Sequence, residues 1–289
     1  MMPLWLSLTV LSAFALATSD ALTKKALAGH NEYLVTWLRL LPSLPIFLIP
    51  LAFMPVPPLR DDFYPCIASA LPLELLAVIL YTKALKLSPL NLTLPLLSLT
   101  PLLLLVLPFL ILGERISRWG AAGIVLIAAG GYLLNARRGQ VGGLAPLRAL
   151  VSEKGSLCML CVAVIYSITS TLGKRAIAAS SPLFFAAVYI PLLVLLVSPV
   201  ALYKGKGELK QMAQNGTIRA SALPALFYVI QVVSHVYAIN LTNVAYMIAV
   251  KRLSLLFGVL YGRYLFQEQG GVAATLIMLA GVFLIVLGG

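Results

Sequence analysis

The chain has 289 residues, of which 61% are hydrophobic and 10% are charged, and its mean hydropathy is +1.00. A soluble domain carries about 25% charged residues, so this chain has too few to cover a surface that faces water. The formal net charge of +12 would suggest a nucleic-acid partner in a soluble protein. Here most Lys and Arg lie in short loops between apolar runs, where the headgroups of a lipid bilayer explain them, and we expect no nucleic-acid partner.

Apolar runs of about 20 residues, the length of a helix that crosses the hydrocarbon core, follow one another along the chain. The first run could pass for a signal peptide, because residues 15–17 (ALA) resemble a cleavage site, but no positive charge precedes it. We expect it to be retained as a helix. The chain is therefore predicted to be an all-α integral membrane protein with ten transmembrane helices, at residues 3–22, 34–54, 66–85, 91–112, 118–134, 156–179, 182–203, 220–241, 244–266 and 271–288.

The second half of the chain repeats the first. Residues 22–26 (LTKKA) return as residues 172–176 (LGKRA), and residues 84–88 (ALKLS) return as residues 238–242 (AINLT). The end of the first apolar run thus matches the end of a later helix, which argues again that it is not a signal peptide. The duplication predicts two structural repeats, each a string of membrane helices.

The repeats have predicted boundaries and a predicted orientation. Residues 138–155 are the long polar connection in the middle of the chain, so we expect a first repeat at 1–137, a linker at 138–155 and a second repeat at 156–289. Because each repeat has five spans, the second starts on the opposite side of the membrane. The two are therefore expected to be inverted repeats, an arrangement typical of transporters that bind substrate between the repeats near mid-membrane.

Polar side chains inside the expected spans are the candidates for function, since a charge at bilayer depth costs about 2.5–3.5 kcal/mol on insertion scales. Glu74 lies near the middle of the third helix, and Tyr81 shares its face. Gln231 and His235 share a face of the eighth helix, which is the counterpart of the third. Lys251 and Arg252 are adjacent in the ninth helix. We predict a substrate-binding set of Glu74, Tyr81, Lys83, Gln231, His235, Lys251 and Arg252.

Other charged residues have a structural interpretation. Lys83 is one turn from a helix end, so snorkelling to the headgroups competes with cavity lining. Asp20 and Arg39 also lie near helix ends and are expected to snorkel or pair, for instance Asp20 with Lys83. Of the charged residues singled out within the spans, four are basic and two acidic, which favours an anionic or zwitterionic substrate. The basic residues are Arg39, Lys83, Lys251 and Arg252, and the acidic ones are Asp20 and Glu74.

Residues 98–134 (SLTPLLLLVLPFLILGERISRWGAAGIVLIAAGGYLL) resemble the repeat signature of the drug/metabolite transporter superfamily, in its EamA branch. The features that carry the resemblance are an early proline, a Gly-Glu-Arg turn and glycines in the following helix, namely Pro101, Gly113, Glu114, Arg115, Gly120 and Gly130. The second copy departs from the pattern, with Leu255 in place of the proline and residues 267–269 (QEQ) at the turn. We expect Glu114 and its counterpart Glu268 to cap helices or pair rather than to bind substrate.

The resemblance implies a ten-helix secondary transporter with two inverted five-helix EamA-type repeats and a central cavity. The resemblance further implies that the protein exports or exchanges amino acids or other small molecules. It implies a multi-pass protein of the cell (inner) membrane that is not an enzyme and needs no cofactor, with a small-molecule substrate and the lipid bilayer as partners. Transport coupled to a proton or a counter-substrate and uncoupled facilitation both stay open. The pair Lys251 and Arg252 is also similar to the Lys-Arg step of the superfamily's sugar-phosphate carriers, where it binds the anionic group.

Alternatives remain open at this point. A membrane scaffold or sensor needs no polar cavity, and an intramembrane enzyme needs a cluster of reactive groups, whereas the two His and nine acidic residues here are scattered. Cys158 and Cys161 have metal or redox spacing but no second ligand pair, so we expect no metal site. Basic residues are more numerous on the side opposite the N-terminus, which places both termini outside the cell; the resemblance implies termini in the cytoplasm.

Overall fold

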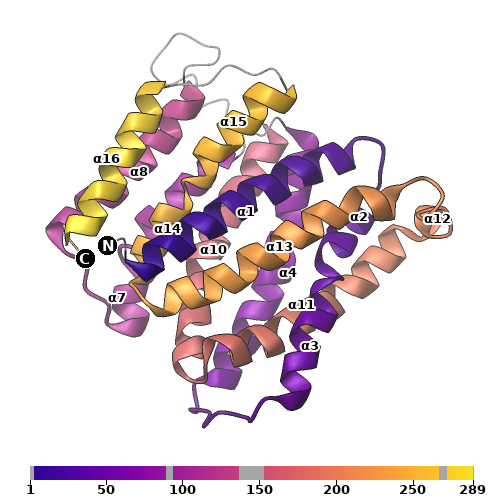
Figure 1. Ribbon diagram of the computed structural model, residues 1–289, viewed down its shortest axis with the longest axis horizontal. Helices are drawn as coiled ribbons and strands as arrows, with labels where there is room; N and C mark the ends of the chain where they lie inside the picture. Colours follow the sequence, from indigo (N-terminus) through magenta and orange to yellow (C-terminus); the bar gives the residue numbers. More distant parts are fainter. Residues whose placement is uncertain (1–2, 89–93, 137–152, 267–271, 289) are drawn as a thin grey trace.

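The computed structural model describes residues 3–88, 94–136, 153–266 and 272–288, and within these ranges every regular element is a helix (Figure 1). The predicted linker lies mostly outside the described residues, and residues 267–269, with Glu268, lie wholly outside them. Six described segments are long and apolar enough to cross a membrane, and further apolar helices are shorter. The count of ten spans stays a prediction.

Five of the expected spans are long continuous helices, and two more are shorter continuous helices. The long ones are α1 (Leu4–Leu27), α4 (Phe63–Leu87), α10 (Lys154–Ala178), α11 (Pro182–Lys204) and α13 (Thr217–Asn240). The shorter ones are α8 (Arg118–Ala136) and α16 (Val272–Gly288). A single turn, α12 (Lys206–Leu209), lies in the connection between α11 and α13.

The expectation of continuous helices at 34–54, 91–112 and 244–266 is wrong, since each of these runs is broken. The first becomes α2 (Glu32–Leu40) and α3 (Ser43–Phe53). The second becomes η1 (Leu94–Leu99), α6 (Thr100–Leu103) and α7 (Leu107–Leu112), and the third becomes α14 (Val244–Lys251) and α15 (Ser254–Phe266).

Prolines account for the first two breaks. Pro42 and Pro45 lack the N–H that a helix interior needs. At the break the amide of Leu44 donates to the carbonyl of Leu41, and the carbonyl of Leu40 accepts the hydroxyl of Ser43 at 2.5 Å instead. Pro101 and Pro108 each lie in the first turn of a short helix, α6 and α7, where the missing N–H costs least.

No proline accompanies the break between α14 and α15. There the amides of Arg252 and Leu253 donate to the carbonyls three residues back, at 2.9 Å each, so the helix tightens by one step. Two of the three broken runs, the fourth and the ninth, occupy corresponding positions in the repeats, whereas α11, the counterpart of the broken second run, is continuous. Discontinuous helices in matching positions of two repeats are the arrangement that transporters use around a binding site.

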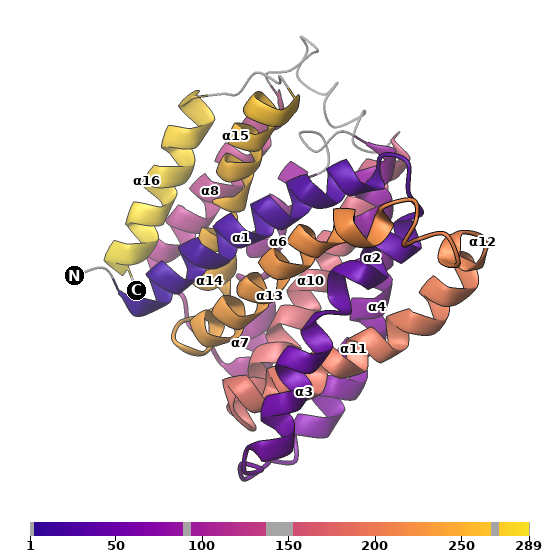
Figure 2. The same ribbon diagram turned by 45° about the vertical axis from the view of Figure 1, so that its right-hand side comes forward.

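The helices pack reciprocally. In Figure 1, α1 of the first repeat runs along α13 of the second, and α10, the counterpart of α1, packs along α4, the counterpart of α13. Helices α8 and α16, which are each other's counterparts, also lie side by side (Figure 2). This exchange of partners is what a twofold relation between the two repeats produces.

Polar contacts fix the directions of the repeated helices. The Nζ of Lys24, near the end of α1, donates to the carbonyl of Ser88 at 2.8 Å, so α1 ends where α4 ends. Arg175, near the end of α10, pairs with Asp62 at 3.0 Å, so α10 ends where α4 begins. The counterparts α1 and α10 therefore run in opposite directions, as expected of inverted repeats. The two chain ends lie at the same end of the molecule (Figures 1 and 2).

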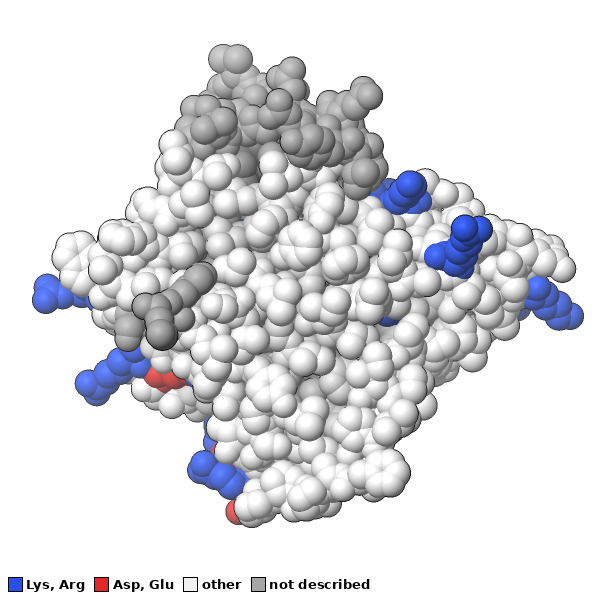
Figure 3. Space-filling model, in the orientation of Figure 1, with Lys and Arg blue, Asp and Glu red and all other residues white. Residues whose placement is uncertain are grey.

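The surface matches a lipid environment. Figure 3 shows a broad face with hardly any charged residues, and Lys and Arg gather at its edges. Large apolar side chains such as Phe53, Leu195 and Phe283 are more than half exposed. An exposed apolar surface of this extent requires a membrane or a partner to cover it.

Candidate functional site: a cavity between the repeats

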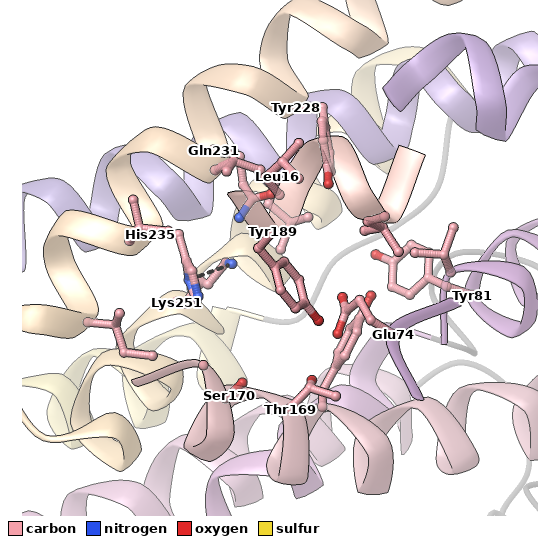
Figure 4. Close-up of a pocket in the computed structure, with 18 of the residues that line it drawn as sticks. Leu16, Glu74, Tyr81, Thr169, Ser170, Tyr189, Tyr228, Gln231, His235 and Lys251 are labelled. Atoms are coloured by element: carbon pink, nitrogen blue, oxygen red, sulfur yellow. Dashed lines mark hydrogen bonds between the residues drawn. The ribbon is translucent and has the colours of Figure 1, made fainter. Parts of the chain in front are cut away.

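A central cavity of about 190 Å³ lies between the two repeats. Its lining comes from α1, α2, α4 and η1 of the first repeat and from α10, α11, α13 and α14 of the second, with Arg252 at the α14–α15 break. Each water in the liquid takes up about 30 Å³, so the space holds on the order of six waters. It can therefore take a small metabolite, and several of its polar side chains are labelled in Figure 4.

The structure brings six of the seven predicted site residues to this one cavity: Glu74, Tyr81, Gln231, His235, Lys251 and Arg252. Their role in binding substrate stays a prediction.

Lys83 is the exception, and its placement at the cavity is corrected by the structure. Along α4 the cavity stripe consists of Glu74, Val78, Tyr81 and Thr82, which share one helix face, and the next residue turns away from it. The Nζ of Lys83 lies 5.9 Å from the centre of the Tyr33 ring, towards the end of the helix.

Two cations lie at the break that ends α14. The Nζ of Lys251 is 3.1 Å from Nδ1 of His235; because a lysine ammonium only donates, the imidazole nitrogen accepts. Arg252 is 4% exposed, and its buried Nε has no hydrogen-bond partner. Within the part of the chain that the structure describes, neither cation forms an ion pair with a carboxylate. The carbonyl end of α14 favours positive charge here, but each side chain retains donors for a ligand.

The opposite side of the cavity carries a carboxylate. Figure 4 shows Glu74 next to Thr169 and Tyr189 and across the cavity from Lys251. Tyr166 and Tyr228 complete a largely aromatic wall around it. The cavity is therefore bipolar, with cations at the α14 break and one acidic group on α4.

A third charged group is the pair of Asp20 and Arg39, which the sequence predicts to snorkel or pair. Nη2 of Arg39 is 3.1 Å from Oδ1 of Asp20, and the hydroxyl of Tyr81 donates to Oδ2 at 2.5 Å. The suggested partnership of Asp20 with Lys83 is therefore wrong. Arg39 also lines the cavity, with its guanidinium 5.4 Å from the centre of the Tyr228 ring. Helix α2 breaks one residue after Arg39, inside the predicted span. The side chain of Arg39 therefore lies at the cavity and not at the lipid headgroups.

Sequence reasoning also missed the uncharged lining. Tyr166, Thr169, Ser170 and Gly173 are spaced as one face of α10, and Tyr189 and Tyr228 face them from neighbouring helices. The sequence signal for this lining is the helical spacing of small and polar residues in α10. It does not separate cavity residues from packing residues, because many tyrosines in an apolar span only pack.

Comparison with known proteins defines the class of this membrane protein. The fold is that of a two-repeat helical membrane protein with a polar cavity between the repeats, which is the general arrangement of a transporter. The sequence model of the EamA-like transporter family matches residues 3–136 and again residues 153–288. The chain belongs to the EamA-like transporter family, and the resemblance seen in the sequence is confirmed. It is a membrane transporter of the drug/metabolite type.

A solved crystal structure has the same fold, with a TM-score of 0.68 over 97% of this chain and 96% of that one. At 18% sequence identity this likeness shows the fold alone. The search among curated proteins gave no significant match.

Proposed function

We propose that the protein is a secondary transporter that moves a small metabolite across the cytoplasmic (inner) membrane by alternating access, as an exporter or exchanger. The observation that carries this proposal is the polar cavity built from both repeats, beside helices that are discontinuous at corresponding positions. Ten spans in two inverted repeats would allow one repeat to rock against the other around such a site. A proton or a counter-substrate is the coupling partner we consider.

The balance of charge at the cavity supports an anionic or zwitterionic substrate. With Lys83 away from the cavity and Arg39 paired with Asp20, the remaining charged groups are Lys251, Arg252 and Glu74. Two cations then face one carboxylate. A carboxylate or phosphate on the substrate fits beside Lys251 and Arg252, because a guanidinium and an ammonium are both donors in a site of low dielectric constant.

A scaffold or sensor protein is the alternative, and the cavity argues against it. Such a protein would bury Glu74 and Lys251 against other protein groups, whereas both side chains line space large enough for a ligand.

A thermal-shift screen of the purified protein tests the proposal. Binding to the folded state stabilises it, by about 2.7 kcal/mol when the free ligand is at 100 times its Kd. The candidates are amino acids, organic anions and phosphorylated sugars, with organic cations as a comparison set. A shift with anions or zwitterions supports the proposal, and a shift with cations alone contradicts the predicted substrate charge.

The double variant Lys251→Gln/Arg252→Gln then tests the site. We expect it to lose both the thermal shift and the transport of the compound that the screen identifies, while keeping a monodisperse folded state. The matched control is Lys83→Gln, which removes a cation that the cavity does not contain. Normal transport by the double variant would refute the role of the two cations.

A further inference from the structure

The Gly-Glu-Arg turn after α7 has a structural role that the cavity does not explain. Gly113 ends α7 in the left-handed conformation, with φ of 70°, which a residue with a side chain rarely adopts. The turn brings Glu114 and Arg115 to the start of α14 in the other repeat. As expected, Glu114 caps and pairs: its Oε2 accepts the Val244 amide at 2.9 Å, and its Oε1 pairs with Lys174.

Three consecutive residues before and at the start of α14 are held in this way. The Nζ of Lys174 donates to the carbonyl of Thr242 at 2.5 Å, and Nδ2 of Asn243 donates to the carbonyl of Arg115 at 3.2 Å. The amide of Val244 donates to Glu114. We call this set the α14 clasp: Glu114, Arg115 and Lys174 holding residues 242–244. It joins the first repeat to the second.

Helix α14 connects the clasp to the cavity. It has 8 residues, all of them buried, so it is a rigid segment about 12 Å long. Its first turn is fixed by the clasp and by the hydroxyl of Tyr246, which accepts the amide of Ser117 at 3.0 Å. Its last residue is Lys251, followed by Arg252. A shift of the clasp along the helix axis must therefore move both cations.

A second layer of contacts joins the repeats at the same end of the molecule. Nε of Arg175 is 3.0 Å from Oδ2 of Asp62, and the guanidinium beside Asp62 lowers the pKa of that carboxyl. The amide of Arg60 donates to the carbonyl of Ala179 at 3.0 Å. Cys66, which is 6% exposed, lies one turn beyond Asp62 in α4, at this end of the molecule.

We propose that Glu114 is a positioning residue and the central element of a gate. In this structure the α14 clasp joins the repeats at the end where the termini lie, and α14 transmits its position to Lys251 and Arg252. Opening that end requires the Glu114–Lys174 pair to separate. This inference rests on the alternating access proposed above. The contact of Lys24 with the Ser88 carbonyl, the counterpart of Lys174 with the Thr242 carbonyl, lies at the opposite end of the molecule.

The native thiol of Cys66 reports on the gate. The chain has three cysteines, so Cys158→Ser and Cys161→Ser leave Cys66 as the only thiol. The rate at which a hydrophilic maleimide labels it is measured in lipid nanodiscs, where both faces are accessible. We expect Glu114→Gln, which removes the charge that holds Lys174, to raise the labelling rate several-fold. Lys174→Gln should have the same effect, and the double variant should add little.

The control is Glu32→Gln. Glu32 pairs with Lys86 within the first repeat at the other end of the molecule, so labelling of Cys66 should stay at its original rate. Unchanged labelling in both Glu114→Gln and Lys174→Gln, with thermal melting equal to that of the parent, would overturn the gate. An equal rise in the control would also overturn it, because the effect would then be general loosening.

A second readout separates positioning from simple support. If α14 transmits the clasp, Glu114→Gln should weaken binding of the compound found in the thermal-shift screen, and Lys251→Gln should leave Cys66 labelling low. The labelling assay needs no substrate. Faster labelling without any ligand in the screen would therefore retain the gate and count against the proposed substrate class.

Discussion

At the scale of single residues, the main feature is charge held away from water. Asp20 is 2% exposed and Arg39 is 9% exposed, and each is the other's ion-pair partner. Taking two charges out of water is costly, and their attraction offsets this cost only while both are present. The hydroxyl of Tyr81 contributes a further hydrogen bond to the carboxylate. The pair therefore orients Arg39 at the cavity wall and depends on both partners.

This dependence gives a stability prediction. Asp20→Asn leaves the guanidinium of Arg39 buried without its counter-charge, and removal of one partner of a buried pair costs about 3–5 kcal/mol. We expect a clear fall in the thermal midpoint, and a partial recovery in Asp20→Asn/Arg39→Gln, where both charges are gone. Asp62→Asn is the control, since its pair with Arg175 is solvent-exposed and should contribute little. A double variant less stable than Asp20→Asn would contradict this account.

The candidate residues could be selected from the sequence because a charge in an apolar span needs a partner, water or a function. That reasoning led to Glu74, Lys251 and Arg252, which line the cavity. It could not choose the partner of Asp20, because Arg39 comes from another helix and tertiary packing decides the match. It also misplaced Lys83, since one step of about 100° along α4 separates the cavity face from its neighbour.

At the scale of elements, sequence length and hydropathy located the helices but not their breaks. Pro42 and Pro45 signalled the end of α2, although membrane helices tolerate prolines when neighbours shield the freed groups. The break at Arg252 had no such signal. There the backbone tightens to hydrogen bonds three residues back, and neither a proline nor a glycine at the break marks it in the sequence.

The crossing of α8 and α16 depends on two glycines. A Cβ at Gly123 would lie 2.5 Å from the carbonyl oxygen of Gly281, and a Cβ at Gly281 would lie 2.6 Å from that of Gly123. Ile127 and Ile285 make the flanking contacts in the same reciprocal way. Close approach of two helix backbones in a membrane requires small residues at the contact.

Substitution at this crossing should therefore be destructive. Gly123→Ala forces the two backbones apart, because the nearest atom is a carbonyl oxygen that has no freedom to move aside. We expect a lower thermal midpoint and a lower yield of folded protein, and the same for Gly281→Ala. The matched control is Gly207→Ala in α12, where a Cβ meets nothing within 4 Å and alanine favours the helix. Equal melting of all three variants would show that the crossing tolerates a methyl group.

At the scale of the whole molecule, the two repeats run in opposite directions and share their packing partners. The duplication visible in residues 84–88 and 238–242 predicted this relation, since five spans per repeat invert the second copy. The side of the membrane that each end faces is a separate question. The clasp end carries few basic residues, and Lys174 and Arg175 there are already paired with Glu114 and Asp62.

Reporter fusions test the topology as a whole. Ten spans require both termini on one side of the membrane and the connection around Gly207 on the other. A reporter active only in the cytoplasm, fused at either terminus or inserted at Gly207, should give one result at both termini and the opposite result at the insertion. Different results at the two termini would mean an odd number of spans and would contradict the ten-helix prediction. The same fusions decide the orientation: active termini agree with the family resemblance, and an active Gly207 insertion agrees with the positive-inside rule, because Lys204, Lys206 and Lys210 flank that position.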